Sequence, residues 1–152
     1  MHRPLVASFV LGFSIASITL VFLSRNASDL WVMESQLKLA NDLRKLGVEA
    51  YRSEDWSKVE SSFAASSAVR GATTKRQWPL EFPLLAWRFS SDDYSQNEHV
   101  LMDESIVAFS MERRGLTEDA AAKFSRLEKA NPNKTAAQLH SDAERFLKAA
   151  SE

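Results

Sequence analysis

Residues 108 to 132 read AFSMERRGLTEDAAAKFSRLEKANP, and this stretch decides the predicted fold. An apolar-periodic segment ends at Gly115, a residue type favoured where a helix stops. Thr117 is a typical N-terminal cap for a second helix, and the two acids behind it suit the positive end of that helix. The Asn-Pro pair at the end of the stretch stops the second helix. The stretch therefore predicts two helices joined by a short turn.

Helical periodicity continues on both sides of this hairpin. Residues 28–50 carry apolar side chains at steps of three and four, and Ser53 can cap a further helix that ends at Gly71. Another helix is expected from about Thr135 to Ala150. No segment alternates as a strand does, so the predicted fold class is all-α. The predicted buried positions include Ala40, Gly47, Ala50, Trp56, Val59, Phe63, Met102, Ile106, Phe109, Ala120, Phe124, Leu127, Ala136, Leu139, Ala143, Phe146, Leu147 and Ala150.

The two predicted helix pairs correspond when the sequence is shifted by 61 residues. The aligned pairs are Gly47 with Ala108, Glu54 with Gly115, Val59 with Ala120, Phe63 with Phe124 and Gly71 with Pro132. This pattern resembles the tetratricopeptide repeat. That family has a small residue in the first helix, a turn, a second small residue, an aromatic residue four positions later and a proline eight positions after that. The second copy matches well, whereas the first has Val59 in place of alanine and Gly71 in place of proline.

The resemblance implies stacked helical hairpins that bind other proteins. Two features depart from the family. The copies are separated by residues 72–97, and two units fall short of the three or more that such arrays need. The last predicted helix, 135–150, would then serve as the cap of the array. A different helical bundle is the alternative.

Residues 77–89 read QWPLEFPLLAWRF and contain four aromatic side chains and two prolines. The prolines break a long helix, a short helical turn is expected at Pro83, and the polar run from Ser90 to Asn97 is predicted to be a loop. Aromatic and arginine side chains dominate protein interfaces, so one interpretation is a partner-binding patch. The alternatives are a core between the helix pairs, or contact with lipid headgroups. The candidate partner-binding residues are Trp78, Phe82, Trp87, Arg88 and Phe89.

Residues 1–27 are interpreted as a short tail followed by a transmembrane helix. Leu5 to Leu23 carry no charge, and nineteen helical residues match the thickness of a bilayer. Positive charge before the helix favours a cytoplasmic N-terminus, with the rest of the chain across the membrane. The alternative is a cleaved signal peptide and a secreted protein. Small residues at steps of four would form a packing face of the transmembrane helix, unless their spacing is incidental: Ser8, Gly12 and Ala16.

The composition argues against several classes of function. A net charge of −1 gives no general attraction to nucleic acid, and the absence of cysteine excludes disulfides and thiolate metal sites. His2, His99 and His140 lack the spacing of a metal site on a helix. The adjacent acids are interpreted as solvated surface: Glu54-Asp55, Asp92-Asp93, Asp103-Glu104 and Glu118-Asp119. No catalytic, metal or cofactor residue is therefore predicted.

The sequence predicts a membrane-anchored helical adaptor or accessory subunit whose partner is a protein in a membrane complex. The alternative is a helical domain that binds a small apolar ligand or lipid in a cleft along the aromatic insertion, and an enzyme is not expected. After the anchor, the predicted organisation of the soluble domain 28–152 is a first helix pair 28–71, the insertion 72–97, a second pair 98–132 and a capping helix 133–152.

Overall fold

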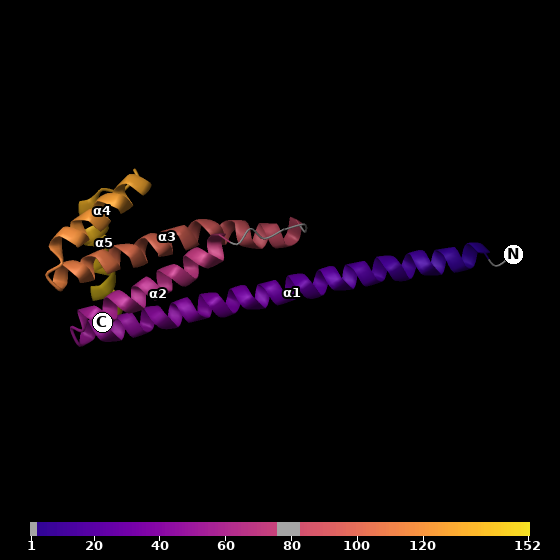
Figure 1. The fold of residues 1–152 in the computed structure, drawn as a ribbon, viewed down its shortest axis with the longest axis horizontal. Helices are drawn as coiled ribbons and strands as arrows, with labels where there is room; N and C mark the ends of the chain where they lie inside the picture. The colour runs from indigo at the N-terminus through magenta and orange to yellow at the C-terminus, as the bar shows by residue number, and fades with distance from the viewer. Residues whose placement is uncertain (1–2, 76–82) are drawn as a thin grey trace. The chain divides into compact units, whose positions relative to one another are not determined.

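The computed structural model describes the backbone of residues 3–75 and 83–152, and the side chains of residues 17, 19–21, 23–24, 31–73 and 97–152. Every regular element in this part of the chain is a helix, which confirms the all-α prediction. The helices, drawn in Figure 1, are α1 (Arg3–Arg52), α2 (Trp56–Lys75), α3 (Pro83–Arg113), α4 (Thr117–Ala130) and α5 (Ala136–Ser151).

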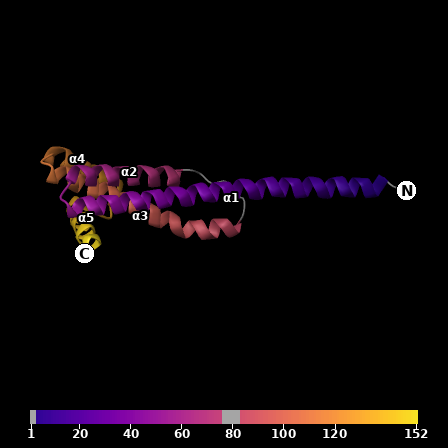
Figure 2. The ribbon, with the colours of Figure 1, turned by 90° about the horizontal axis from the view of Figure 1, so that it is seen from below.

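The chain divides into two compact units, Met1–Ser35 and Gln36–Glu152. The second unit contains the last turns of α1 together with α2 to α5. In both Figure 1 and Figure 2, α2 runs beside these turns of α1, and it also packs against α3. Helices α4 and α5 pack against α3 and against each other. The pocket and the polar cluster described below lie within this second unit.

The predicted transmembrane helix requires correction. Residues 5–23 are not a separate element but the opening part of α1, which continues through Arg25 and Asp29 to Arg52. Among the residues that the structure describes, no helix is long and apolar enough to cross a membrane. The prediction of a membrane-spanning helix is therefore wrong. The side chains of its predicted packing face, Ser8, Gly12 and Ala16, lie outside the described set.

The segment between the two helix pairs also differs from the prediction. Helix α2 continues past Gly71 to Lys75, and α3 begins at Pro83, where a fixed φ and a missing N–H suit the first turn of a helix. The predicted loop from Ser90 to Asn97 is wrong, because this run lies inside α3. Two of the predicted partner-binding residues, Trp78 and Phe82, lie outside the described residues. For the other three, Trp87, Arg88 and Phe89, the backbone is described but the side chains are not.

The turn between α1 and α2 has the same backbone hydrogen bonds as the turn between α3 and α4. The N–H of Asp55 donates to the carbonyl of Ala50 at 3.0 Å, and the N–H of Leu116 donates to the carbonyl of Met111 at 3.0 Å. These donors and acceptors are related by the 61-residue shift seen in the sequence. The shift therefore relates two turns of the same construction.

Two of the expected helix caps are not formed: one is replaced by a neighbouring residue, and the other has no substitute. The side chain of Asp55 accepts from the N–H of Lys58 at 3.1 Å, so Asp55 caps α2, whereas the Ser53 hydroxyl donates back to α1. Thr117 is the first residue of α4, and the residue before it makes no side-chain cap. Helix α5 begins with a capping box in which Thr135 and Gln138 bond each other's backbone N–H groups.

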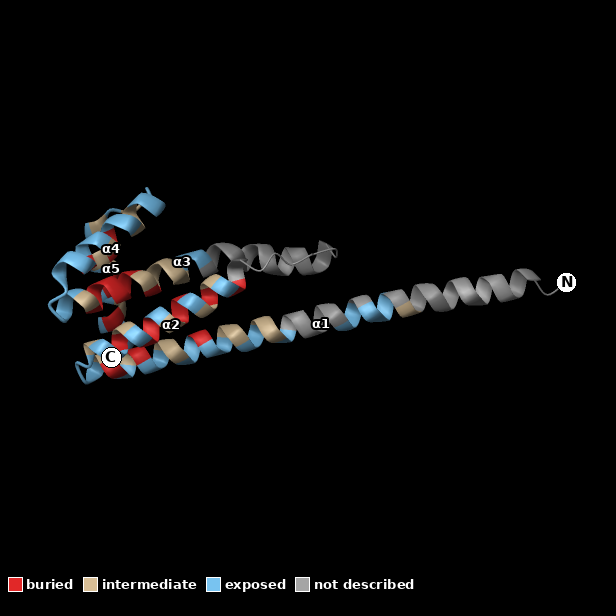
Figure 3. Cartoon of the chain, viewed as in Figure 1, coloured by how far each residue is buried: buried red, intermediate tan, exposed pale blue. Residues whose placement is uncertain are grey.

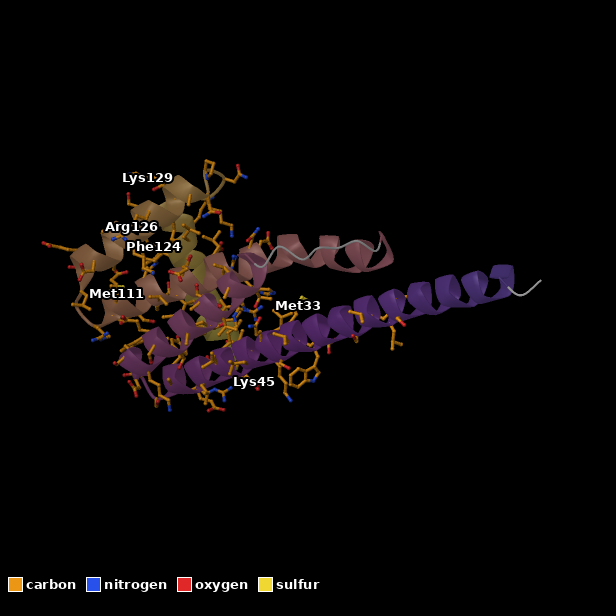
Figure 4. All side chains as sticks on the ribbon, turned by 45° about the vertical axis from the view of Figure 1, so that its right-hand side comes forward. Met33, Lys45, Met111, Phe124, Arg126 and Lys129 are labelled. Atoms are coloured by element: carbon orange, nitrogen blue, oxygen red, sulfur yellow. The ribbon has the colours of Figure 1, made fainter. Side chains whose placement is uncertain are left out.

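The core lies where α1, α2, α4 and α5 meet the C-terminal half of α3, which carries buried residues in Figure 3. Phe63 is fully buried, and it lies so close to Gly47 that a Cβ on Gly47 would stand 2.5 Å from its ring. Phe124 on α4, labelled in Figure 4, is also buried, while the predicted burial of Ala150 is wrong because this residue is exposed. The buried apolar residues are Ala40, Ala50, Val59, Phe63, Ile106, Val107, Ala108, Phe109, Ala120, Phe124, Leu139, Ala143 and Leu147.

Candidate functional site

A partly buried arginine, Arg44, connects α1 to α3. Its Nε donates to Asp103 Oδ1 at 2.6 Å, and its Nη2 donates to the carbonyl of His99 at 2.9 Å. Its Nη1 lies 3.0 Å from Nδ1 of His99. A guanidinium has only donors, so Nδ1 of His99 must be the acceptor and the imidazole is neutral, with its proton on Nε2. The ring of Phe146 on α5 faces the guanidinium at 5.5 Å.

Asp103 is fully buried. It lies at the centre of a polar cluster that also contains Arg44, Ser66, Arg70 and His99. Its Oδ1 accepts from Arg44, its Oδ2 accepts from the hydroxyl of Ser66 at 2.8 Å, and Arg70 Nε of α2 lies 3.7 Å from Oδ2. Burial raises the pKa of Asp103, and Arg44, Ser66 and Arg70 oppose this shift. Both oxygens act as acceptors, which is the bonding pattern of an ionised carboxylate.

Two cations of the polar cluster contact the same carboxylate. Arg44 and Arg70 share the single carboxylate of Asp103. The pKa of His99 is lowered, first by burial and then by the charges of Arg44 and Arg70, whereas Glu98 raises it. Burial and Arg44 also lower the pKa of Arg70, and Asp103 raises it. Burial is thus the largest cause of the lowered pKa of both His99 and Arg70.

A pocket of about 600 Å³ opens beside this cluster, and we name it the Arg44 pocket. Arg44 lines it from α1, and Leu139, Asp142 and Phe146 line it from α5. Its other walls are formed by residues between Asn97 and Ser105 of α3 and by the connection from Ala130 to Lys134. Leu101 and Met102 add apolar surface from α3. The pocket thus combines an apolar wall with charged and amide side chains.

Lys134 supplies a second cation at the pocket. Its ammonium donates to Asp142 Oδ2 at 2.8 Å, and Arg145 pairs with the other oxygen of the same carboxylate at 2.5 Å. The hydrogen bond from Lys134, followed by the charges of Lys134 and Arg145, lowers the pKa of Asp142, although burial raises it. Two cations again contact one carboxylate, although Arg145 itself is exposed and does not line the pocket.

The structure changes the interpretation of several residues that the sequence analysis singled out. Asp103 was predicted to lie on the solvated surface and is instead fully buried. His99 and His140 have different partners, since His140 pairs with Glu112 at 2.9 Å and lies against the rings of Phe109 and Phe124. Within the described residues, no group of three or more His, Asp or Glu side chains could hold a metal ion.

Sequence reasoning missed the polar cluster, although a signal for it exists. Asp103 lies three residues before the buried Ile106, and Arg44 lies four residues after the buried Ala40. Arg70 lies seven residues after the buried Phe63. Each is a charged residue on an apolar helix stripe, and a buried charge requires a partner.

Comparisons with known proteins add no family to this description. No family model matches the chain, and no curated protein and no solved structure is significantly similar to it. The functional argument therefore depends on the geometry and charge of the Arg44 pocket.

Proposed function

We propose that the protein is a helical interaction protein that binds a segment of a partner protein in the Arg44 pocket. The observation that carries the proposal is the mixed lining of this pocket, with Leu101, Met102 and Phe146 on one side and the polar connection 131–134 on the other. Peptide recognition needs both kinds of surface, because apolar anchors supply affinity while polar groups bond the partner's backbone and side chains.

The side chains around the pocket are held in place by other contacts. Arg44 is fixed by three hydrogen bonds and by Phe146, and α5 begins at a complete capping box. A preorganised surface loses little conformational entropy on binding. This favours the pocket as a recognition site over the surrounding exposed helix faces.

A small apolar ligand or lipid is the second candidate and is less well matched. Arg44, Glu98, Lys134 and Asp142 all line the pocket. An apolar ligand would cover some of these groups without replacing their contacts with water, and this desolvation opposes binding. A peptide can satisfy them with its own amide and charged groups.

A peptide-display selection against the immobilised full chain tests the proposal. We expect enriched peptides whose affinity is reduced at least about tenfold by Asn97→Trp, which places a large ring at the exposed edge of the pocket. The matched control is Lys129→Trp, an equally exposed helix position on α4 outside the pocket lining. Peptides that bind both variants as tightly as the original chain would overturn the proposal.

A further inference from the structure

One side of α1 within the second unit is exposed and carries leucine beside charge. Leu39 is 51% exposed and Leu46 is 44% exposed, and the two lie seven residues apart on the same side of the helix. Charged residues at steps of four, three and four share this side and are exposed as well. We name these residues the outer face of α1: Lys38, Leu39, Asp42, Lys45, Leu46 and Glu49.

The charges of the outer face become their own complement when their order is reversed. Along the helix the signs are positive at Lys38, negative at Asp42, positive at Lys45 and negative at Glu49. The spacing between them is the same in either direction. Two such faces laid antiparallel therefore bring Lys38 opposite Glu49 and Asp42 opposite Lys45, each twice by symmetry. A parallel pair would instead set every charge opposite an identical one, which is unfavourable.

The same antiparallel arrangement brings exposed leucines of two copies together. With the charges in register, Leu39 of one copy and Leu46 of the other are offset by two residues, about 3 Å along the helix axis. Leucine side chains reach across such an offset, so each leucine can cover the other and leave water. The charges thus select the direction of pairing, and the leucines contribute apolar burial.

We propose that the outer face of α1 binds a second copy of this chain, with the two α1 helices antiparallel about a two-fold axis. The charge order argues for a second copy, because a two-fold interface requires a surface that is complementary to itself. Every residue of the outer face belongs to the unit Gln36–Glu152. The pairing is weak, because exposed ion pairs contribute little and the apolar area is small.

The pairing leaves the Arg44 pocket free and does not depend on the function proposed for it. Arg44 follows Asp42 by two residues, a rotation of about 200° around the helix axis. Its side chain therefore points to the opposite side of α1, towards α3, where it contacts Asp103. Each dimer would present two Arg44 pockets.

Sedimentation equilibrium of the full chain over a range of concentrations tests the charge pairing. Lys38→Glu sets a like charge opposite Glu49 at both ends, and should raise the dissociation constant of the dimer at least about fivefold. Adding Glu49→Lys to this variant restores opposite charges only in the antiparallel pair, and should return the constant to within about twofold of the original.

A pair of leucine variants tests the apolar contact. Leu39→Gln should raise the dissociation constant at least about tenfold, because it places an amide in the apolar part of the interface. The matched control is Leu116→Gln, which changes another exposed leucine, 38% exposed and outside the outer face, and should leave the constant unchanged.

Single cysteines report the direction of pairing, since the chain has none of its own. In the antiparallel pair the two copies of position 42 are about 4.5 Å apart along the axis, and the two copies of position 49 are about 16 Å apart. A short bis-maleimide should therefore link the Asp42→Cys variant much more efficiently than the Glu49→Cys variant. Equal linking of the two variants would indicate a parallel pair and overturn the proposal.

Two further outcomes would also overturn it. A chain that stays monomeric at every concentration has no such interface. Association that Lys38→Glu and Leu39→Gln leave unchanged would place the contact outside the outer face. Neither outcome affects the function proposed for the Arg44 pocket, which the peptide selection tests separately.

Discussion

Glu54 and Gly115 lie 61 residues apart and occupy the same position in the two helix–helix turns, where each has a positive φ, 57° and 86°. Their N–H groups donate to the carbonyls of Tyr51 and Glu112, which are related by the same shift. The turn thus requires a left-handed residue in both hairpins. Glycine adopts this conformation at little cost, whereas glutamate carries a Cβ that opposes it.

Exchanging the residue types at these two positions should change stability in opposite directions. Glu54→Gly should stabilise the chain by about 0.5 to 1 kcal/mol, because it relieves the unfavourable φ. Gly115→Ala should destabilise it by about 1 to 2 kcal/mol, although a Cβ there meets no atom within 4 Å, so the effect is conformational. Denaturant unfolding of both variants measures this, and two changes of the same sign would contradict the shared turn geometry.

The same substitution, glycine to alanine, should have opposite effects on stability at Gly47 and at Gly71. A Cβ on Gly47 would lie 2.5 Å from the buried ring of Phe63, so Gly47→Ala should destabilise the chain by about 1 to 3 kcal/mol through overpacking. A Cβ on Gly71 would meet no atom of the described side chains within 4 Å, and Gly71→Ala should stabilise α2 by about 0.5 to 1 kcal/mol. Thermal melts compare the two, and a neutral Gly47→Ala would mean that α1 and α2 are farther apart.

The buried and exposed ion pairs of α1 should differ strongly in their contribution to stability. Asp103→Asn leaves Arg44 and Arg70 without their shared carboxylate in a buried site, and should cost about 3 to 5 kcal/mol. The control is Asp42→Asn, which removes an exposed pair with Lys45 and should cost less than about 0.5 kcal/mol. Similar losses in equilibrium unfolding would show that Asp103 is not buried as described.

His99 should make folding dependent on pH below its ordinary pKa of 6.5. Burial, Arg44 and Arg70 lower the pKa of His99 in the folded state, while Glu98 opposes them. As pH falls from 6.5, the unfolded chain therefore binds the proton first, and stability is lost until the folded pKa is reached.

The variant His99→Asn keeps an acceptor for Arg44 but cannot be protonated in this range. Its free energy of unfolding should fall less than that of the original chain between pH 6.5 and pH 5, measured in denaturant at each pH. If the free energy of unfolding changed equally with pH in the two proteins, His99 would not be the cause of the pH dependence.

The fold was predictable where apolar residues recur at helical spacing, because such a stripe indicates a helix with one buried face. The stripes that contain Phe63, Phe124 and Leu139 were recognised, and these residues are buried. A helical start at Pro83 was expected, but the helical conformation of residues 90–97 was missed, because a polar run without an apolar stripe is also typical of a loop. The apolar residues 5–23 were taken for an independent element, which their continuity with the charged remainder of α1 corrects.

The candidate site was not predictable to the same extent. Arg44, Arg70 and Asp103 each lie on an apolar stripe, but their mutual pairing depends on how α1, α2 and α3 pack. The connection 131–134 lines the pocket only because α5 folds back beside α3. The resemblance to the tetratricopeptide repeat and the role of the aromatic insertion remain predictions.

Hydrogen exchange on the full chain, with and without a selected peptide, tests most directly whether the Arg44 pocket is the binding site. Bound peptide should slow exchange at the backbone of residues 131–135, of which 131–134 line the pocket, and at residues 97–105 of α3. The turn between α1 and α2 should be unchanged. Slower exchange at that turn alone, with none at residues 131–135, would contradict the account.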